Sequence, residues 1–150
     1  MGVHVRKQIR DAVLLAVTGL ATTGANVFAE KTTTLEDSAL PALTFASRTD
    51  TPDIEPGRVE VGKFGLTPHE YLFVINAHVK QAAGLADVLD TISSEVTVAL
   101  AGGVTIAGAT RYPILIEEEF DFTGEGEQPV ATLSMAWRVN YYAKTNQPDV

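Results

Sequence analysis

The alternation of apolar and polar side chains near the C-terminus constrains the fold more than any other feature of the sequence. From Val130 to Tyr142, every second side chain is apolar: Ala131, Leu133, Met135, Trp137, Val139 and Tyr141. A period of two is typical of a β-strand with one buried face. The run that starts at Arg111 is also strand-like, and its apolar residues share one parity that only Glu118 breaks: Ile114, Ile116, Phe120 and Phe122. Residues 123–129 (TGEGEQP) predict a wide turn between the runs, so we predict a long C-terminal β-hairpin over 111–144.

A hairpin alone is marginal in water and needs a second layer over its apolar face. Two segments have apolar residues at helical spacing, Val3–Leu20 and Gly84–Ala101. Their apolar stripes are Val5, Ile9, Val13, Ala16 and Leu20 in the first, and Leu85, Val88, Leu89, Ile92, Val96, Ala99 and Leu100 in the second. We predict that these helices pack on the sheet and that Trp137 is buried between the two layers.

The remaining segments predict further strands over 25–31, 40–47 and 70–80, the last being the strongest central strand. Residues 48–57 contain two prolines and predict an exposed loop, and 58–67 is a weak strand broken by two glycines. We therefore expect an arm near 48–69, and a plain connection over Val104–Ala109. The chain lacks a strand–helix–strand rhythm, so we predict one α+β domain over 1–150. It has a mainly antiparallel sheet with two helices packed on one face.

Composition excludes several classes of protein. The chain has 150 residues, no cysteine and a formal net charge of −8. Disulfides and thiolate metal sites are therefore excluded, and a grip on nucleic-acid phosphates is disfavoured. An acidic surface still suits a channel past which DNA slides. No apolar run approaches the roughly 20 residues that a membrane span needs, so we expect no membrane contact.

The N-terminus imitates a secretion signal, because His4–Arg10 is basic and Ala12–Val17 is apolar. Asp11 lies between the two parts and the apolar part is short, so we expect no cleaved signal. The basic residues Arg6, Lys7 and Arg10 could bind phosphate, but a solvated helix face is the favoured interpretation.

Motifs of catalysis are missing from the sequence, including the phosphate loop, the nucleophile elbow and the zinc-protease motif. The histidines are His4, His69 and His78. A metal site needs ligands that converge on one point. His69 and His78 have opposite parity in the predicted strand, so their side chains should diverge. We predict ordinary surface or turn histidines.

The carboxylates of Glu117, Glu118 and Glu119 form an acidic run on a predicted strand. Only Glu117 and Glu119 can share a face there, and no second cluster completes an acid–base pair. A solvated strand face that resists edge pairing is the favoured interpretation, and Glu125 and Glu127 should likewise be solvated. The tyrosines favour core or interface packing over base stacking: Tyr71, Tyr112, Tyr141 and Tyr142. We predict no enzyme, and no catalytic, cofactor-binding or metal-binding residues.

Three stretches together resemble the tail terminator proteins of long-tailed bacteriophages and phage-like particles. They are the opening VHVRKQIRDAVLLAVTGLATTGANVFAEK, the middle LADVLDTISSEVTVAL and the closing FTGEGEQPVATLSMAWRVNYYAK. The resemblance spans most of the chain but includes no catalytic motif. Residues 48–69, with their extra prolines and glycines, resemble the family least.

The resemblance implies a structural protein of the virion, located at the junction of head and tail and assembled in the host cytoplasm. Such proteins form a ring, typically a hexamer, that caps the tail tube, ends its polymerisation and contacts a neck or head-completion protein. DNA passes through the lumen without specific binding. The implied partners are other copies of the chain, the tail tube protein and the neck protein. We expect the 48–69 arm and the 123–129 loop to make contacts between subunits.

The sequence also allows other functions. A different neck or head-completion protein of the same particle would have the same composition. A secreted or periplasmic domain that binds a small ligand is suggested by the signal-like N-terminus and the acidic charge. An enzyme acting through Glu117 and Glu119 would need a concave site with perturbed carboxylates.

Overall fold

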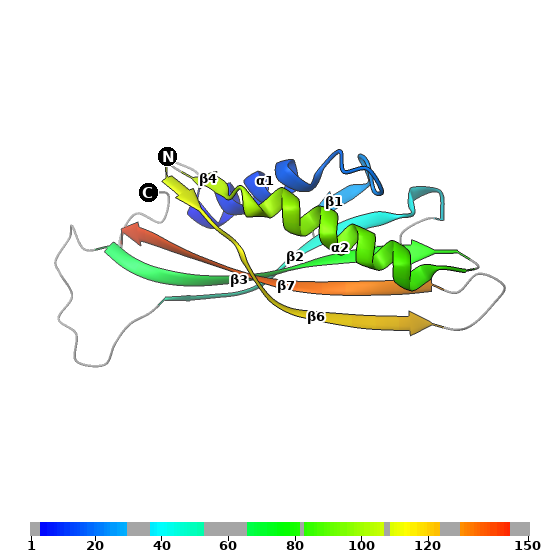
Figure 1. The fold of residues 1–150 in the computed structure, drawn as a ribbon. Coiled ribbons are helices and arrows are strands. Elements are labelled where there is room, and N and C mark those ends of the chain that lie inside the picture. Colours follow the sequence, from blue (N-terminus) through cyan, green and yellow to red (C-terminus); the bar gives the residue numbers. More distant parts are fainter. Residues whose placement is uncertain are drawn as a thin grey trace.

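A five-stranded sheet forms the base of the molecule, and both helices lie on one of its faces (Figure 1). The computed structural model describes residues 4–29, 37–52, 66–81, 83–106, 109–123 and 130–144. The strand order is β1-β2-β3-β7-β6, in which β1 runs parallel to β2 and all other neighbours are antiparallel. The strands are β1 (Val27–Ala29), β2 (Ala42–Pro52), β3 (Leu66–Lys80), β6 (Ile114–Thr123) and β7 (Val130–Lys144). The predicted α+β class and the long C-terminal strands are confirmed.

The longest pairing joins β3 to β7, from Leu66 opposite Lys144 to Lys80 opposite Val130. Opposite residues of an antiparallel pair point to the same face of the sheet. The buried residues of both strands share one face, with Phe73 opposite Trp137 near its middle. The alternation in β7 therefore predicted the buried face correctly, and Trp137 is buried as expected.

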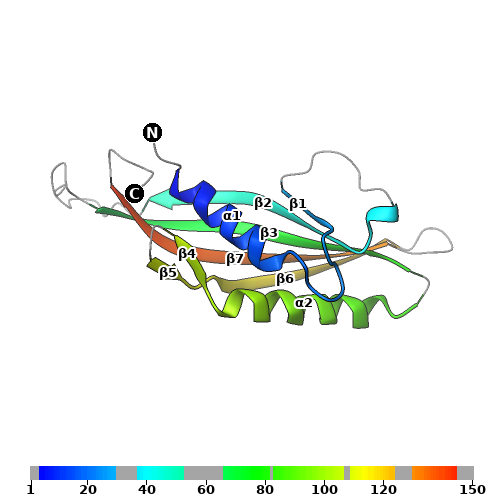
Figure 2. The same cartoon turned by 90° about the horizontal axis from the view of Figure 1, so that it is seen from above.

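The helices α1 (Val5–Val17) and α2 (Leu85–Ala101) cover this face. Figure 2 shows α1 above the β2 and β3 side of the sheet and α2 on the side of β7 and β6. Each helix buries one apolar stripe, as its spacing predicted. The first helix is shorter than predicted, because α1 ends at Val17 and Leu20 lies beyond it. The fully buried helix residues are Val5, Ile9, Val13, Val17, Leu89, Ile92, Val96 and Leu100. Among the described helices, none is long and apolar enough to cross a membrane.

A small second sheet follows α2, where a plain connection was expected. Its strands are β4 (Val104–Ile106) and β5 (Ala109–Arg111), which pair antiparallel. Gly103, which follows the C-cap residue Gly102 of α2, has a φ of 78°, and a Cβ there would lie 2.7 Å from the side chain of Thr110. The turn into β4 therefore requires glycine. Val104 and Ile106 are buried, so β4 extends the core beyond α2.

The sequence-based boundaries near 48–69 were partly wrong. Arg48–Pro52 continue β2 and do not form a loop, and Leu66–His69 already belong to β3. Pairing with a central strand overrides the weak strand propensity of these residues. The rest of the expected arm, residues 53–65, lies outside the described residues, as does most of the expected 123–129 loop.

The apolar residues of β6 have the same parity in the sequence, which predicts that they share one face, and this prediction was also wrong. A bulge between Leu115 and Glu117 shifts the register against β7. A bulge adds one residue to one strand and so exchanges the two faces beyond it. Ile114 lies opposite Arg138 on the face away from the helices, whereas Phe120 lies opposite Leu133 on the helix side.

Candidate functional site

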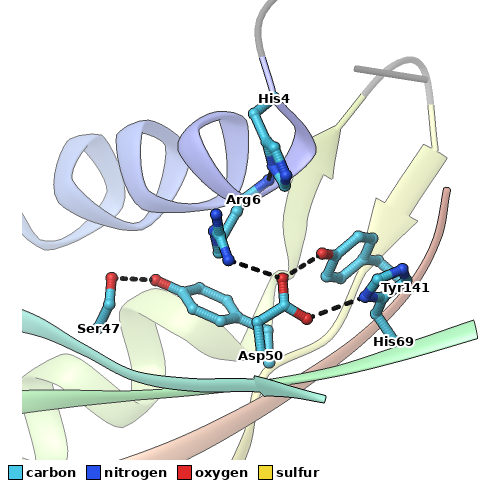
Figure 3. Close-up of polar contacts among 7 residues, drawn as sticks. His4, Arg6, Ser47, Asp50, His69 and Tyr141 are labelled. Atoms are coloured by element: carbon cyan, nitrogen blue, oxygen red, sulfur yellow. Dashed lines mark hydrogen bonds and ion pairs between the residues drawn. The ribbon is translucent and has the colours of Figure 1, made fainter. Parts of the chain in front are cut away.

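A polar cluster around Asp50 lies near the end of the sheet where β2 and β3 lead into residues 53–65 (Figure 3). The carboxylate of Asp50 is only 6% exposed. It accepts a hydrogen bond from the Tyr141 hydroxyl at 2.5 Å and one from the Arg6 guanidinium at 3.4 Å. His69 Nδ1 lies 3.1 Å from its other oxygen, and this nitrogen must carry the proton because a carboxylate only accepts.

Ring stacking and a second hydrogen bond brace the same cluster. The rings of His69 and Tyr141, which are opposite in the β3–β7 register, stack with centroids 4.8 Å apart. The hydroxyls of Ser47 and Tyr71 lie 2.6 Å apart. At the start of α1, His4 Nδ1 accepts a hydrogen bond from the backbone nitrogen of Arg6. The cluster thus ties α1 to β2, β3 and β7.

The chemistry of the cluster is that of a structural anchor. Burial and the hydrogen bond to Asp50 raise the pKa of Tyr141 far above its ordinary value of 10. The phenol therefore stays protonated and acts as a donor, not as a base. The pKa of Tyr141 is raised only in the folded state, so the unfolded chain releases this proton at a lower pH than the folded chain. The contribution of the Tyr141 phenol to stability is therefore present below pH 10 and is lost as the pH rises above that value.

An open hollow of about 510 Å³ adjoins the anchor. Prolines, polar residues and two tyrosines line it: Thr51, Pro52, Pro68, His69, Glu70, Asn140, Tyr141 and Tyr142. The hollow lies at the ends of β2 and β3 that lead into residues 53–65.

The candidate residues singled out in the sequence do not converge on one site. Glu117 and Glu119 share the face away from the helices, as predicted, because they lie opposite Ala136 and Ser134. Glu118 points to the helix side and accepts a hydrogen bond from Ser93 of α2. Within the described part of the chain, no three acidic, histidine or cysteine residues are grouped as metal ligands. Glu125 and Glu127 lie outside the described residues.

The histidines diverge as their parity predicted. His69 joins the Asp50 anchor on the helix side, whereas His78 lies on the opposite face of the sheet. There its Nε2 lies 2.9 Å from the hydroxyl of Thr44, and its Nδ1 lies 3.4 Å from that of Thr132. Burial lowers the pKa of His78 below its ordinary value of 6.5, because the charged form loses hydration.

We expect this histidine to make the protein less stable in mild acid. The unfolded chain takes up the proton at a higher pH than the folded chain, so the contribution of His78 is present above pH 6.5 and is lost below it. In urea unfolding between pH 7.5 and 5, the wild-type protein should lose more stability than a His78→Gln variant. His4 and His69 are common to both proteins and cancel in the difference. Parallel pH profiles for the two proteins would refute this expectation.

The tyrosines divide between core and surface. Tyr71 and Tyr141 are buried in the sheet, in agreement with the packing role expected from the sequence. Tyr112 and Tyr142 are exposed, and the guanidinium of Arg111 lies 5.4 Å from the ring centroid of Tyr142.

Asp50 is the functional candidate that the sequence analysis missed. It was placed in a loop because two prolines follow within six residues. A bulge in β2 between Ser47 and Thr49 also reverses the faces, so that Asp50 lies opposite Tyr71 on the helix side. Without the bulge, Asp50 would share the face of Thr44 and Ala46, which have the same parity. No local pattern in the sequence predicts the bulge in β2.

The outer edge of β6 is a second candidate site. β6 is the last strand of the sheet, and among the described residues no strand pairs with its outer edge. Four large apolar side chains of β6 are about half exposed: Ile114, Ile116, Phe120 and Phe122. Exposed edges with apolar side chains are prone to pair with another chain.

No protein-family model matches the chain, and no curated protein matches it either. Among the solved structures that match is a chain from the virion of a native gene transfer agent particle. It shares 17% sequence identity, the alignment covers 92% of each chain, and the TM-score is 0.44. A TM-score at this level carries no argument about function.

Proposed function

We propose that this chain is a structural protein of a phage-like virion, a subunit of the ring that caps the tail tube. The observation that carries the proposal is the outer edge of β6. It leaves backbone groups and half-exposed phenylalanines without a strand partner among the described residues. The acidic residues and the bulge of β6 oppose indiscriminate pairing of this edge. The half-exposed phenylalanines on the same strand favour a specific partner, as in a protein that completes its fold by assembly.

The resemblance in sequence supports the choice of assembly. The opening stretch forms α1 and β1, the middle stretch forms α2, and the closing stretch contains β7. These elements contribute to both layers of the domain. A tail terminator with this fold would form a homo-oligomeric ring, which we propose to be a hexamer, between the tail tube protein and a neck or head-completion protein.

The charge of the chain supports a channel that DNA crosses without being held. With a net charge of −8 per chain, a ring of identical subunits presents a strongly negative field to the phosphates. Like charge in the lumen would keep DNA from adhering to the wall. We propose that DNA passes through the ring and is not bound specifically.

The proposal is tested by tube growth in the absence of heads. Purified tail tube protein should polymerise to a shorter mean length when this chain is added, and labelled chain should be found at one tube end. A different neck protein of the same particle would bind only after the end is already capped. Unchanged tube length with no bound chain would contradict the proposal.

We propose that residues 53–65 and 124–129 add contacts to the tube or to neighbouring subunits, as their glycine and proline content first suggested. Pro52 lies opposite His69 in the β2–β3 register, so a short glycine–serine linker can replace 53–65 without moving either strand. The shortened protein should fold as the wild type does and bind tubes more weakly. Normal tube binding would show that 53–65 makes no such contact.

A further inference from the structure

Charge is distributed unequally between the two edges of the sheet. On the side of α2 and β6, the two elements carry no lysine, arginine or histidine. They carry seven acidic residues, namely Asp87, Asp90, Glu95, Glu117, Glu118, Glu119 and Asp121. Together α2 and β6 therefore contribute a charge of −7.

Apolar side chains occupy the same acidic side. The rings of Phe120 and Phe122 lie parallel, with an interplanar angle of 2° and centroids 6.3 Å apart. They are 45% and 52% exposed, on the helix side of the edge strand. Of the acidic residues of β6, Glu118 lies on the same face, and Glu117, Glu119 and Asp121 lie on the other. A pair of aromatic rings held in one orientation on an acidic edge strand has the composition of an interface anchor.

The opposite side of the molecule carries the complementary charge. There α1 touches β1, the other edge strand, and Arg6 reaches β2 through its ion pair with Asp50. Arg6 pairs with Asp50, and Lys7 and Arg10 share Asp11, so three basic and two acidic side chains leave this surface a net charge of +1. The exposed surface of α1 also includes Leu15, which is 79% exposed. The α1 surface therefore combines a positive charge with one exposed apolar residue. The β6 surface combines a negative charge with two exposed phenylalanines.

We infer that the β6 edge of one copy, with Phe120 and Phe122, docks against the α1 and β1 edge of the next copy. The inference rests on the proposed ring and names the surface through which the ring is built. The strands β1 and β6 form opposite edges of one sheet, so the contact between two copies is head to tail. Such a heterologous contact leaves a free surface of each kind and propagates until the ring closes.

Charge decides between this contact and a symmetric dimer. A twofold contact of β6 with β6 would place four acidic residues of one copy against the same four of the other. Juxtaposed like charges oppose association, whereas acidic and basic surfaces attract and fix the register. The β6 surface therefore selects the α1 surface of a second copy and rejects its own kind.

Complementary charge reversals test the contact. One variant carries Glu119→Lys and Asp121→Lys on β6, and the other carries Lys7→Glu and Arg10→Glu on α1. Each variant alone should dissociate at least about tenfold more readily than the wild type, as followed by light scattering and native mass spectrometry. An equimolar mixture should regain assembly, because each reversed surface now meets its complement on the other variant. Failure of the mixture to reassociate would overturn the inference.

Matched variants separate a loss of contact from a loss of charge or fold. Thr105→Lys also adds positive charge, at an exposed site on β4 outside both surfaces, and should assemble normally. Phe120→Ala with Phe122→Ala should weaken assembly by about tenfold or more, whereas Val98→Ala, at a 72% exposed site on α2, should not. A wild-type chain that stays monomeric also overturns the inference. The tube-growth assay then decides the proposed function separately.

Discussion

Replacing Trp137 by alanine should lower the free energy of unfolding by about 3–5 kcal/mol. Trp137 is 3% exposed and lies opposite Phe73 on the sheet face that the helices cover. Its removal leaves a large cavity between the two layers, which β7 cannot close because β3 and β6 hold it on both sides. Urea unfolding at a fixed protein concentration should show a lower midpoint and an unchanged slope.

Trp137→Phe is the matched control for this substitution. The indole nitrogen is buried without a hydrogen-bond partner among the described residues, so phenylalanine loses part of the packed volume but no hydrogen bond. Its cost should be clearly smaller than that of alanine. Equal stabilities of the wild type and Trp137→Ala would show that the layer between sheet and helices is not packed as described.

Replacing Asp50 by alanine should have the second largest effect, about 2–3 kcal/mol. The change removes the acceptor of the buried Tyr141 hydroxyl and of His69 Nδ1. The Arg6 guanidinium is half exposed and can return to water, so its lost ion pair adds little. Chemical unfolding measures the total, and amide hydrogen exchange should show faster exchange at the adjoining ends of β2 and β3.

Asp11→Ala provides the comparison with a surface carboxylate. Asp11 is 51% exposed and pairs with Lys7 one helical turn away. Exposed pairs of this kind contribute about 0.3–0.5 kcal/mol, so the variant should stay close to the wild type. If Asp11→Ala and Asp50→Ala had the same cost, the Asp50 cluster would not be the anchor that its burial indicates.

The predictable part of the fold consisted of elements with one face buried and one exposed. One whole face of β7 is buried in the core, so apolar and polar side chains alternate from Ala131 to Tyr141. In α2, one apolar stripe packs on the sheet. The ends of β2 and β3 were not predictable, because their pairing across Pro52 and His69 depends on a partner strand and not on local propensity. The β4–β5 pair was missed because its strands have only three residues each.

The two candidate sites differ in how far the sequence could indicate them. Glu117 and Glu119 were correctly placed on one face, because the bulge in β6 precedes both of them. Asp50 was not found, since the bulge in β2 precedes it and exchanges its face. Phe120 and Phe122 are exposed because α2 does not cover this part of β6. The position of a helix on a sheet is set by packing and cannot be read from the strand sequence.

Electron microscopy of the purified chain, alone and mixed with tail tubes, tests the central claim most directly. We expect closed rings of one size, and with tubes a ring at one end of each tube with an open lumen. Particles that remain monomeric and leave both tube ends bare would contradict the account of this chain as a ring-forming cap of the tail tube.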